Sequence, residues 1–380
     1  MSMLLFMPWC RIDDVYKAGD ITILPFCAHK PAPNVGEPAW SEVSRVLSSY
    51  RDIKGNVVDS AALIHVAGNC LTDDVTSDQI NLAGDLVSLA CFSALAKREF
   101  FGLDFDYCNS DCFTLILQKF ATPDDTALIV RRRDGRTWSV WSMGGISISV
   151  PVHCHTIKRV SIDRDLLEAL LEQRQSLPGN VWGRWQNAIA CFNQASTDSD
   201  NIREHVEWVL LCSAFEYLLK AKTNAKDVAR LFDETMTPRQ VIDARDCRRL
   251  DERRTGNGSS VRCEWMREFY CIRGAFAHGQ LNPRQPMAWK PHEHLLLATV
   301  AFPLVVKSLL AKAGVFTLTD DDDAQIACFE RLADMSEFFA DPPDKKGSSD
   351  SHWRRLLTDY ESKRAFENFK NENVFPDERP

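Results

Sequence analysis

The chain has 380 residues, of which 45% are hydrophobic and 26% are charged, a composition typical of a globular protein long enough for two domains. Its formal net charge of −8 excludes a global attraction to nucleic acid, so any site for a polyanion must be a local patch. The 13 cysteines show no dense spacing pattern, which indicates reduced thiols in a cytoplasm. The apolar start MSMLLFMPWC is short and has no Lys or Arg before it. We therefore expect a cytoplasmic protein with neither signal peptide nor membrane span.

Residues 1–160 mix two hydrophobic periods and predict an α+β domain of unknown role. Ile21–Phe26 has the composition of a strand, and Ser77 is placed to cap a helix that runs to about Lys97. Turn-forming clusters separate four later β-rich runs at the spacing of antiparallel hairpins, namely 113–120, 127–132, 137–141 and 146–152. These runs predict a four-stranded antiparallel β-meander with at least one helix packed on it.

Two histidines and two cysteines in this domain raise the question of a zinc site. His153 and His155 fall on one side of a predicted strand, and Cys108 and Cys112 lie upstream. Four such side chains could in principle close a tetrahedral site, but their spacing matches no recognised zinc pattern. Exposed histidines beside buried thiols are the commoner arrangement. We therefore predict no metal and no cofactor.

Residues 161–340 are almost entirely helical in pattern and predict an all-α domain. Helices are expected over 163–175, 181–192, 202–222, 225–234, 238–249, 261–280, 291–313 and 320–339. The run 202–222 is apolar almost all round, as in the buried centre of a bundle. It contains Glu216, whose carboxylate requires a cationic partner there. Residues 341–380 predict a linker and an amphipathic helix from Trp353, which docks on the body or on a protein partner.

The stretch 261–280 carries the chemistry. Its apolar residues recur three or four apart along one helix face, and off that face lie Arg273 and, five residues later, His278 followed by Gly279. An always-charged guanidinium beside an imidazole that titrates near neutral pH suits a phosphodiester. Nine arginines against six acids between 239 and 273 give a local charge of +3. A solvated, salt-bridged surface is the commoner origin of such a run, and a phosphate-binding rim is the functional alternative. The candidate RNA-binding residues are Arg253, Arg254, Arg262 and Arg267.

These residues together resemble the HEPN superfamily, and within it the Apea-like branch associated with bacterial abortive-infection proteins. The resemblance covers roughly 161–339: a helix with AFEYLL, a variable segment, and a helix that ends in Arg-x4-His-Gly. Arg273 and His278 match the Arg-x4-His motif of the family, Gly279 matches the glycine that often follows, and Glu216 resembles the acid of the earlier helix. The chain departs from the pattern at Gly274, where family ribonucleases usually have Asn or another polar residue.

The resemblance implies a HEPN-like helical bundle and a metal-independent endoribonuclease of an antiviral defence, abortive-infection or toxin type. His278 would take the 2′-OH proton as general base, and Arg273 would stabilise charge on the phosphate. Residues five apart on a helix diverge by about 140°, so a site completed across a homodimer is implied. The alternative is a non-catalytic HEPN module that dimerises and binds RNA, nucleotide or a protein partner in a regulatory role. An RNA-cleavage assay on the wild type and the His278→Ala variant distinguishes the two.

Overall fold

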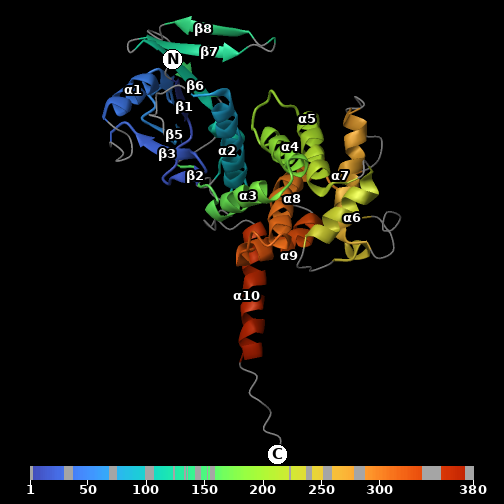
Figure 1. Cartoon of the computed structure of the whole chain (residues 1–380). Helices are drawn as coiled ribbons and strands as arrows, with labels where there is room; N and C mark the ends of the chain where they lie inside the picture. The colour runs from blue at the N-terminus through green and yellow to red at the C-terminus, as the bar shows by residue number, and fades with distance from the viewer. Residues whose placement is uncertain are drawn as a thin grey trace, which may run out of the picture. The chain divides into compact units, whose positions relative to one another are not determined.

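The computed structural model describes residues 3–29, 37–67, 75–98, 107–122, 125–131, 134, 136–141, 147–151, 153–154, 159–221, 224–236, 242–250, 259–277, 287–335 and 352–372. These residues form an α+β protein, as the sequence predicts, and they divide into two compact units (Figure 1). Of the described residues, the first unit contains those of 3–98, 107–175 and 193–202, and the second contains those of 176–192 and 203–372. The sequence places the start of the helical domain at 161, whereas residues up to Gln175 group with the first unit.

The first unit is built on a seven-stranded sheet with the strand order β2-β3-β5-β1-β6-β7-β8, in which all neighbours are antiparallel. The strands are β1 (Met3–Met7), β2 (Tyr16–Ala18), β3 (Ile21–Cys27), β5 (Ser60–Val66), β6 (Ile116–Thr122), β7 (Asp125–Arg131) and β8 (Thr137–Trp141). All five residues of β1 are buried, which explains why this central strand reads as an unbroken apolar run. The strand predicted at Ile21–Phe26 is confirmed as β3.

The prediction that 146–152 forms the fourth strand of the meander was wrong. β6, β7 and β8 are consecutive in both chain and sheet. Among the described residues 147–151, however, the structure forms only β9 (Ile148–Ser149), which pairs in parallel with β4 (Tyr50–Arg51) instead of with β8. An apolar run indicates a strand but carries no information on its partner, and here the partner lies about a hundred residues away.

The first unit also contains α1 (Glu37–Leu47), α2 (Ser77–Leu95), the 3₁₀ turn η2 (Ser110–Phe113) and α3 (Arg164–Ser176). The predicted helix from Ser77 is confirmed as α2, but its N-cap is Thr76. The Thr76 hydroxyl accepts a hydrogen bond from the Gln79 N–H at 3.3 Å, and the Gln79 side chain accepts one from the Thr76 N–H at 2.8 Å. This reciprocal capping box fixes the start of the helix one residue earlier than predicted.

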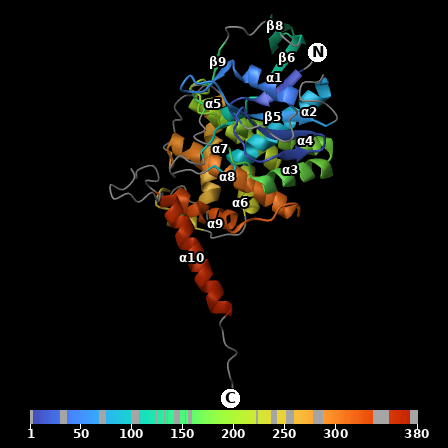
Figure 2. The same cartoon turned by 90° about the vertical axis from the view of Figure 1, so that its left-hand side faces the viewer.

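The described part of the second unit is helical (Figure 2). Its elements are α4 (Gly179–Ala195), α5 (Glu204–Leu219), α6 (Ala225–Thr235), the 3₁₀ turn η3 (Ala244–Asp246), α7 (Val261–Ala277), α8 (Pro291–Lys312), α9 (Asp320–Asp334) and α10 (His352–Glu372), with the last three residues of α4 counted in the first unit. α5 contacts α6, α7 and α8, and its buried residues include Trp208, Leu211, Cys212 and Phe215. The prediction that this helix lies at the centre of the helical part is therefore confirmed.

The helix predicted over 238–249 was wrong for the residues that the structure describes there. Between 242 and 250 the only regular element is η3. The Ile242 N–H donates to the Glu330 carboxylate at 2.6 Å, and Asp243 forms a β-bridge with Ser260. Because these tertiary contacts use the backbone groups, they replace the local hydrogen bonds that a helix needs.

α8 is long and apolar enough to cross a membrane by length and composition, and among the described helices it is the only one. Its most apolar window has a mean hydropathy of 1.9, and 78% of that window is buried inside the protein. The buried Lys307 on this helix is neutralised by Asp322, whose Oδ1 lies 2.7 Å from Nζ. Burial in the unit therefore accounts for the apolar character of α8.

α10 corresponds to the predicted C-terminal helix. It contacts α9 and extends beyond it in both views (Figures 1 and 2). Arg364 of α10 lies 3.3 Å from Asp320 and 3.6 Å from Asp323, the acidic first turn of α9. The attachment is thus partly electrostatic, between a cation and a helix N-terminus that carries several acids.

Candidate functional site

The helix that carries Arg273 is fixed at its start and packed along its length. α7 begins after Ser260, whose hydroxyl accepts a hydrogen bond from the Cys263 N–H at 3.2 Å. Val261, Trp265, Phe269 and Ile272 of the predicted apolar face are buried. α7 ends at Ala277, directly before His278. His278 and Gly279 lie outside the described residues, so the structure places Arg273 but not its motif partner.

Arg273, Glu216 and Tyr270 form one hydrogen-bonded cluster between α5 and α7. The Arg273 Nη1 donates to Glu216 Oε1 at 3.0 Å and to the Tyr270 hydroxyl at 3.0 Å, and Nη2 lies 2.9 Å from Glu216 Oε2. The Tyr270 hydroxyl in turn donates to Glu216 Oε1. The Arg273 side chain is 27% exposed. The cationic partner expected for Glu216 is therefore Arg273, and the cluster reaches the surface through the guanidinium.

The contacts of Arg273 engage both of its Nη atoms on the side that faces Glu216. A guanidinium has five N–H groups in a fixed plane. Nη1 faces both Glu216 Oε1 and the Tyr270 hydroxyl, Nη2 faces Glu216 Oε2, and Nε is enclosed with no hydrogen-bond partner among the described residues. The Nη hydrogens that point away from Glu216 are thus the donors most available to an incoming anion. Burial, and then the neighbouring Glu216 carboxylate, raise the pKa of Tyr270, so its hydroxyl keeps the proton that it donates to Glu216.

Trp208 holds the two helices of this cluster together. Its indole Nε1 donates to the Phe269 carbonyl, one helical turn before Arg273, at 2.9 Å. Its ring stacks on Phe269 with centroids 5.1 Å apart and meets Phe276 edge-on at 5.2 Å. Because Trp208 lies on α5 two turns before Glu216, the same side chain fixes the backbone that carries both members of the ion pair.

The predicted RNA-binding arginines do not behave as a group. Arg262 was predicted to contact RNA, and the structure contradicts this: its side chain is 1% exposed, and Nε lies 2.6 Å from Asp233 and 3.3 Å from Glu330. Arg267 is half-exposed and donates to Glu264 at 2.7 Å. Arg253 and Arg254 lie outside the described residues.

The local excess of arginine is also neutralised by tertiary contacts that a count of charges cannot show. Six of the nine arginines between 239 and 273 lie in the described part of the chain, and each has a carboxylate within 4 Å. The pairs are Arg245–Asp243, Arg248–Asp334, Arg249–Glu293, Arg262–Asp233, Arg267–Glu264 and Arg273–Glu216. These six arginines therefore form a salt-bridged surface and core rather than a free basic rim.

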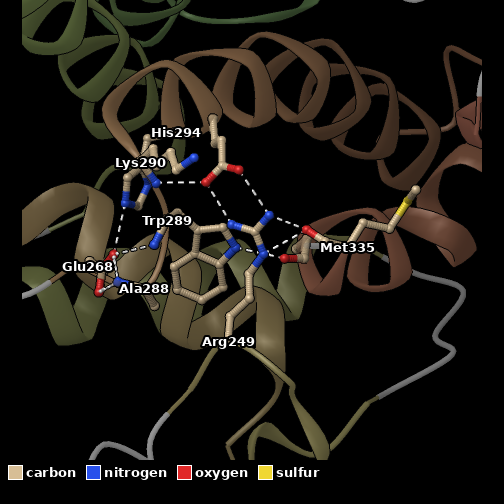
Figure 3. Close-up of polar contacts among 9 residues, drawn as sticks. Arg249, Glu268, Ala288, Trp289, Lys290, His294 and Met335 are labelled. Atoms are coloured by element: carbon tan, nitrogen blue, oxygen red, sulfur yellow. Dashed lines mark hydrogen bonds and ion pairs between the residues drawn. The ribbon is translucent and has the colours of Figure 1, made fainter. Parts of the chain in front are cut away.

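A buried polar network joins α7 to the start of α8 (Figure 3). The Glu268 carboxylate accepts hydrogen bonds from the N–H groups of Ala288 at 2.9 Å and Trp289 at 3.1 Å. Its Oε1 lies 3.0 Å from Nε2 of the fully buried His294. Burial lowers the pKa of His294 in spite of the neighbouring Glu268, so the ring is neutral and donates Nε2–H to the carboxylate. Glu268 thus fixes the chain where it returns from 278–286 to α8.

The same close-up shows a second ion pair beside this network (Figure 3). Arg249 donates to both oxygens of Glu293, with Nη1 at 2.6 Å and Nη2 at 3.0 Å, and its Nε donates to the Met335 carbonyl at 2.7 Å. Glu293 also accepts from the Lys290 N–H at 2.7 Å, which fixes the first turn of α8. These groups are buried and mutually satisfied, so their role is to hold α8, α9 and the 242–250 segment together.

Comparison with protein-family models, with curated proteins and with solved structures found no match. The site is therefore interpreted from its own residues.

The thiols that raised the zinc question lie close together without a closed ligand set. The Cys154 Sγ donates to the Cys112 Sγ at 3.6 Å, and both side chains are buried, as is Cys108. His153 lies 3.5 Å from Asp111 instead, and His155 lies outside the described residues. No group of three or more His, Cys, Asp or Glu side chains among the described residues is arranged to hold a metal ion.

Sequence reasoning missed Tyr270 and His294. Tyr270 lies three residues before Arg273, a spacing that places both on neighbouring positions of one helix face, and this signal was available. His294 lies in the predicted apolar helix that begins at Pro291, but its partner Glu268 is 26 residues away and on another helix. No local pattern indicates that pairing.

Proposed function

We propose that this protein is a metal-independent endoribonuclease of HEPN type with an Arg-x4-His active site, acting in the cytoplasm in abortive infection, antiviral defence or as a toxin. The observation that carries the proposal is the state of Arg273. Its guanidinium is oriented by Glu216 and Tyr270, retains partial exposure, and lies one turn before the end of α7. The next residue after that helix is His278. The helical residues between 161 and 340 would then be the HEPN-like bundle.

The proposed reaction is an in-line transfer within the RNA backbone. His278 takes the proton of a ribose 2′-OH, the resulting oxygen attacks the adjacent phosphorus, and the bond to the 5′-oxygen breaks. The departing 5′-oxygen receives a proton, which leaves a 2′,3′-cyclic phosphate on one fragment. Arg273 donates from its guanidinium to a non-bridging oxygen, where negative charge builds up in the transition state. Arg253, Arg254 and Arg267 are the proposed contacts to the flanking phosphates.

A homodimer completes this site in the proposal. On one helix the two motif residues diverge by about 140°, so a single copy does not direct both at the same phosphate. Two copies related by a two-fold axis bring Arg273 of one and His278 of the other together. Light scattering on the full chain tests this part, because a strict monomer at the concentration of the cleavage assay contradicts it.

A second function is favoured by a specific observation. The two Nη atoms of Arg273 already meet the Glu216 carboxylate, as in a structural ion pair. A HEPN module that dimerises and binds RNA, nucleotide or a protein partner without cleaving would have the same contacts. α10, which extends beyond α9, is the surface proposed for a protein partner in that case.

The deciding experiment is cleavage of end-labelled RNA by the purified protein in EDTA. We expect fragments with cyclic phosphate ends from the wild type and none from His278→Ala or Arg273→Ala. His29→Ala is the matched control, since His29 is an exposed histidine of the first unit with 80% of its side chain accessible. If the wild type leaves RNA intact while it binds RNA as tightly as the His278→Ala variant, the non-catalytic function is correct and the nuclease is not.

A further inference from the structure

We propose that Cys112 and Cys154 form a redox-sensitive dithiol, which a small hydroperoxide converts into a disulfide while the protein stays folded. Both cysteines belong to the first unit, and neither takes part in the proposed nuclease, so the proposal goes beyond that function and does not depend on it. In a cytoplasm the free thiols are the expected state, and a disulfide there is usually transient and formed in response to an oxidant.

The two sulfur atoms of the pair are already neighbours. Cys154 Sγ donates to Cys112 Sγ at 3.6 Å, although the two residues are 42 positions apart in the chain. A disulfide has an S–S distance of about 2.05 Å, so the sulfurs must approach by about 1.5 Å, which is less than an ångström for each side chain. Cys10, Cys91 and Cys108 are buried in the same unit, but none of them has such a hydrogen bond to another thiol that the structure describes.

Asn109 holds both halves of the pair in place. It is fully buried, its Oδ1 accepts from the Cys112 thiol at 3.6 Å, and its Nδ2 donates to the His153 carbonyl at 2.5 Å. His153 directly precedes Cys154, so one amide orients a sulfur of the pair and the backbone that carries the other. Nδ2 also lies 3.0 Å from Asp198, which fixes the amide itself. Two thiols held in this way meet at a high effective concentration, which favours closure within the chain.

Cys154 is the sulfur that we assign to the first step of the reaction. It is the more accessible of the two residues, with 7% of its surface exposed against 0% for Cys112. Cys154 loses its proton, and its sulfur attacks one oxygen of hydrogen peroxide. An S–O bond forms, the O–O bond breaks, and the hydroxide that leaves takes up the proton. Cys154 is then a sulfenic acid.

Cys112 resolves this intermediate in the second step. Its sulfur attacks the Cys154 sulfur, the S–S bond forms, and the S–O bond breaks. The hydroxyl group leaves with the Cys112 proton as water. In sum, two thiols are oxidised to one disulfide, and one hydrogen peroxide is reduced to two molecules of water.

The disulfide joins two parts of the first unit that are far apart in the sequence. Cys112 lies in η2, whereas Cys154 follows β9, the strand that pairs with β4. A cross-link between them restricts the unfolded chain more than the folded one. The first unit should therefore resist unfolding better when it is oxidised.

The test is a peptide map of the wild type. The folded protein is treated with excess hydrogen peroxide, the peroxide is removed with catalase, and free thiols are alkylated in urea before mass spectrometry. We expect a linked pair of peptides that contain Cys112 and Cys154, lighter by two hydrogens and separated by dithiothreitol. Cys271, an exposed cysteine of α7, reports that the peroxide has acted. Oxidised Cys271 beside fully alkylated Cys112 and Cys154 overturns the proposal, and so does a link between other cysteines.

Three variants test the order of the steps. In Cys112→Ala no resolving thiol remains, so dimedone should trap the sulfenic acid of Cys154, whereas Cys112 should stay a thiol in Cys154→Ala. Cys108→Ala is the matched control, because Cys108 is a buried cysteine four residues before Cys112, and its loss should leave the link intact. Dimedone on Cys112 in Cys154→Ala, at the rate of closure in the wild type, overturns the assigned order. Loss of the link in Cys108→Ala overturns the assigned pair.

Calorimetry and metal analysis complete the test. We expect oxidation of the wild type to raise the Tm of the first unit by about 5–15 °C, with no such rise in Cys154→Ala. A lower Tm of the cross-linked protein would mean that the native pair must be distorted to close, which overturns its description as a preformed dithiol. Stoichiometric zinc that is lost in both Cys112→Ala and Cys154→Ala overturns the proposal as well, because the pair would then be metal ligands.

Discussion

Replacing Arg262 with Met tests whether this arginine is structural or binds RNA. Arg262 on α7 joins Asp233 of α6 and Glu330 of α9, with Nε at 2.6 Å and 3.3 Å from their oxygens and 1% of its side chain exposed. Removing one member of a buried ion pair leaves the other charge uncompensated and costs about 3–5 kcal/mol. Met fills much of the same volume, so little of that cost comes from a cavity.

The cost should depend on pH in a direction that the structure specifies. Burial raises the pKa of Glu330 to about 7, well above the value of about 4.3 for an unperturbed Glu. A raised folded-state pKa means that the folded protein binds the extra proton, so this contribution to stability is present at low pH and is lost as the pH rises through 7. Without Arg262 the carboxylate is costlier to ionise. The destabilisation by Arg262→Met is therefore expected to be smaller at pH 5 than at pH 8.

Urea unfolding followed by circular dichroism, at pH 5 and at pH 8, measures both effects. Arg267→Met is the matched control: Arg267 lies on the same helix, is 36% exposed and pairs with Glu264 three residues earlier, so its loss should cost less than about 1 kcal/mol. Filter binding of RNA is measured on all three proteins. An unchanged urea midpoint together with weaker RNA binding by Arg262→Met would refute the structural role.

Two further predictions concern the same helix. Gly274 is exposed within α7, and a Cβ there meets nothing within 4 Å. Gly274→Ala should therefore stabilise the protein by about 0.5–1 kcal/mol, which raises Tm by about 1–4 °C in a calorimetric scan. A lower Tm would show that the position is constrained. Burial opposes ionisation of Glu268, but hydrogen bonds from His294 and from the Ala288 and Trp289 N–H groups lower its pKa overall. A lowered folded-state pKa gives stability that is fully present above the ordinary pKa of Glu, about 4.3, and is lost as the pH falls through the lowered value. Glu268→Gln should therefore be more destabilising at pH 7 than at pH 3 in urea unfolding. A cost that is equal at both values would contradict the charged state of Glu268.

The helices that the sequence predicts well are those whose apolar residues also determine their packing. α5, α7 and α8 each have a long apolar face or are apolar all round, and each is buried where the pattern places it. Prediction fails where a distant group uses the backbone. The segment that begins at Ile242 has helical composition. The Ile242 N–H nevertheless donates its hydrogen bond to the carboxylate of Glu330, which lies 88 residues later in the chain. Hydrophobic periodicity depends only on residues that are close in the sequence, so it does not predict such a contact.

The candidate site shows the same division between local and distant information. Glu216 was expected to need a cation because it lies in an apolar helix, and this argument from burial leads to Arg273. Arg262 was predicted to bind RNA because the argument counted the charges between 239 and 273, and a count of charges does not show which side chains are exposed. The sequence shows where an arginine lies along the helix. It does not show that Asp233 and Glu330, on two other helices, converge on it.

The pairing of the arginines bears on how such a site would select its substrate. Attraction of RNA by released counterions requires unpaired basic groups, and each of the six described arginines between 239 and 273 lies beside a carboxylate. The chain as a whole is acidic, with a net charge of −8, so long-range attraction is weak as well. What the cluster offers instead is a directed guanidinium, since Glu216 and Tyr270 hold Arg273 in place while 27% of its side chain stays exposed. If the proposed nuclease function is correct, such a site would discriminate at the phosphate by geometry in the transition state rather than by affinity for RNA.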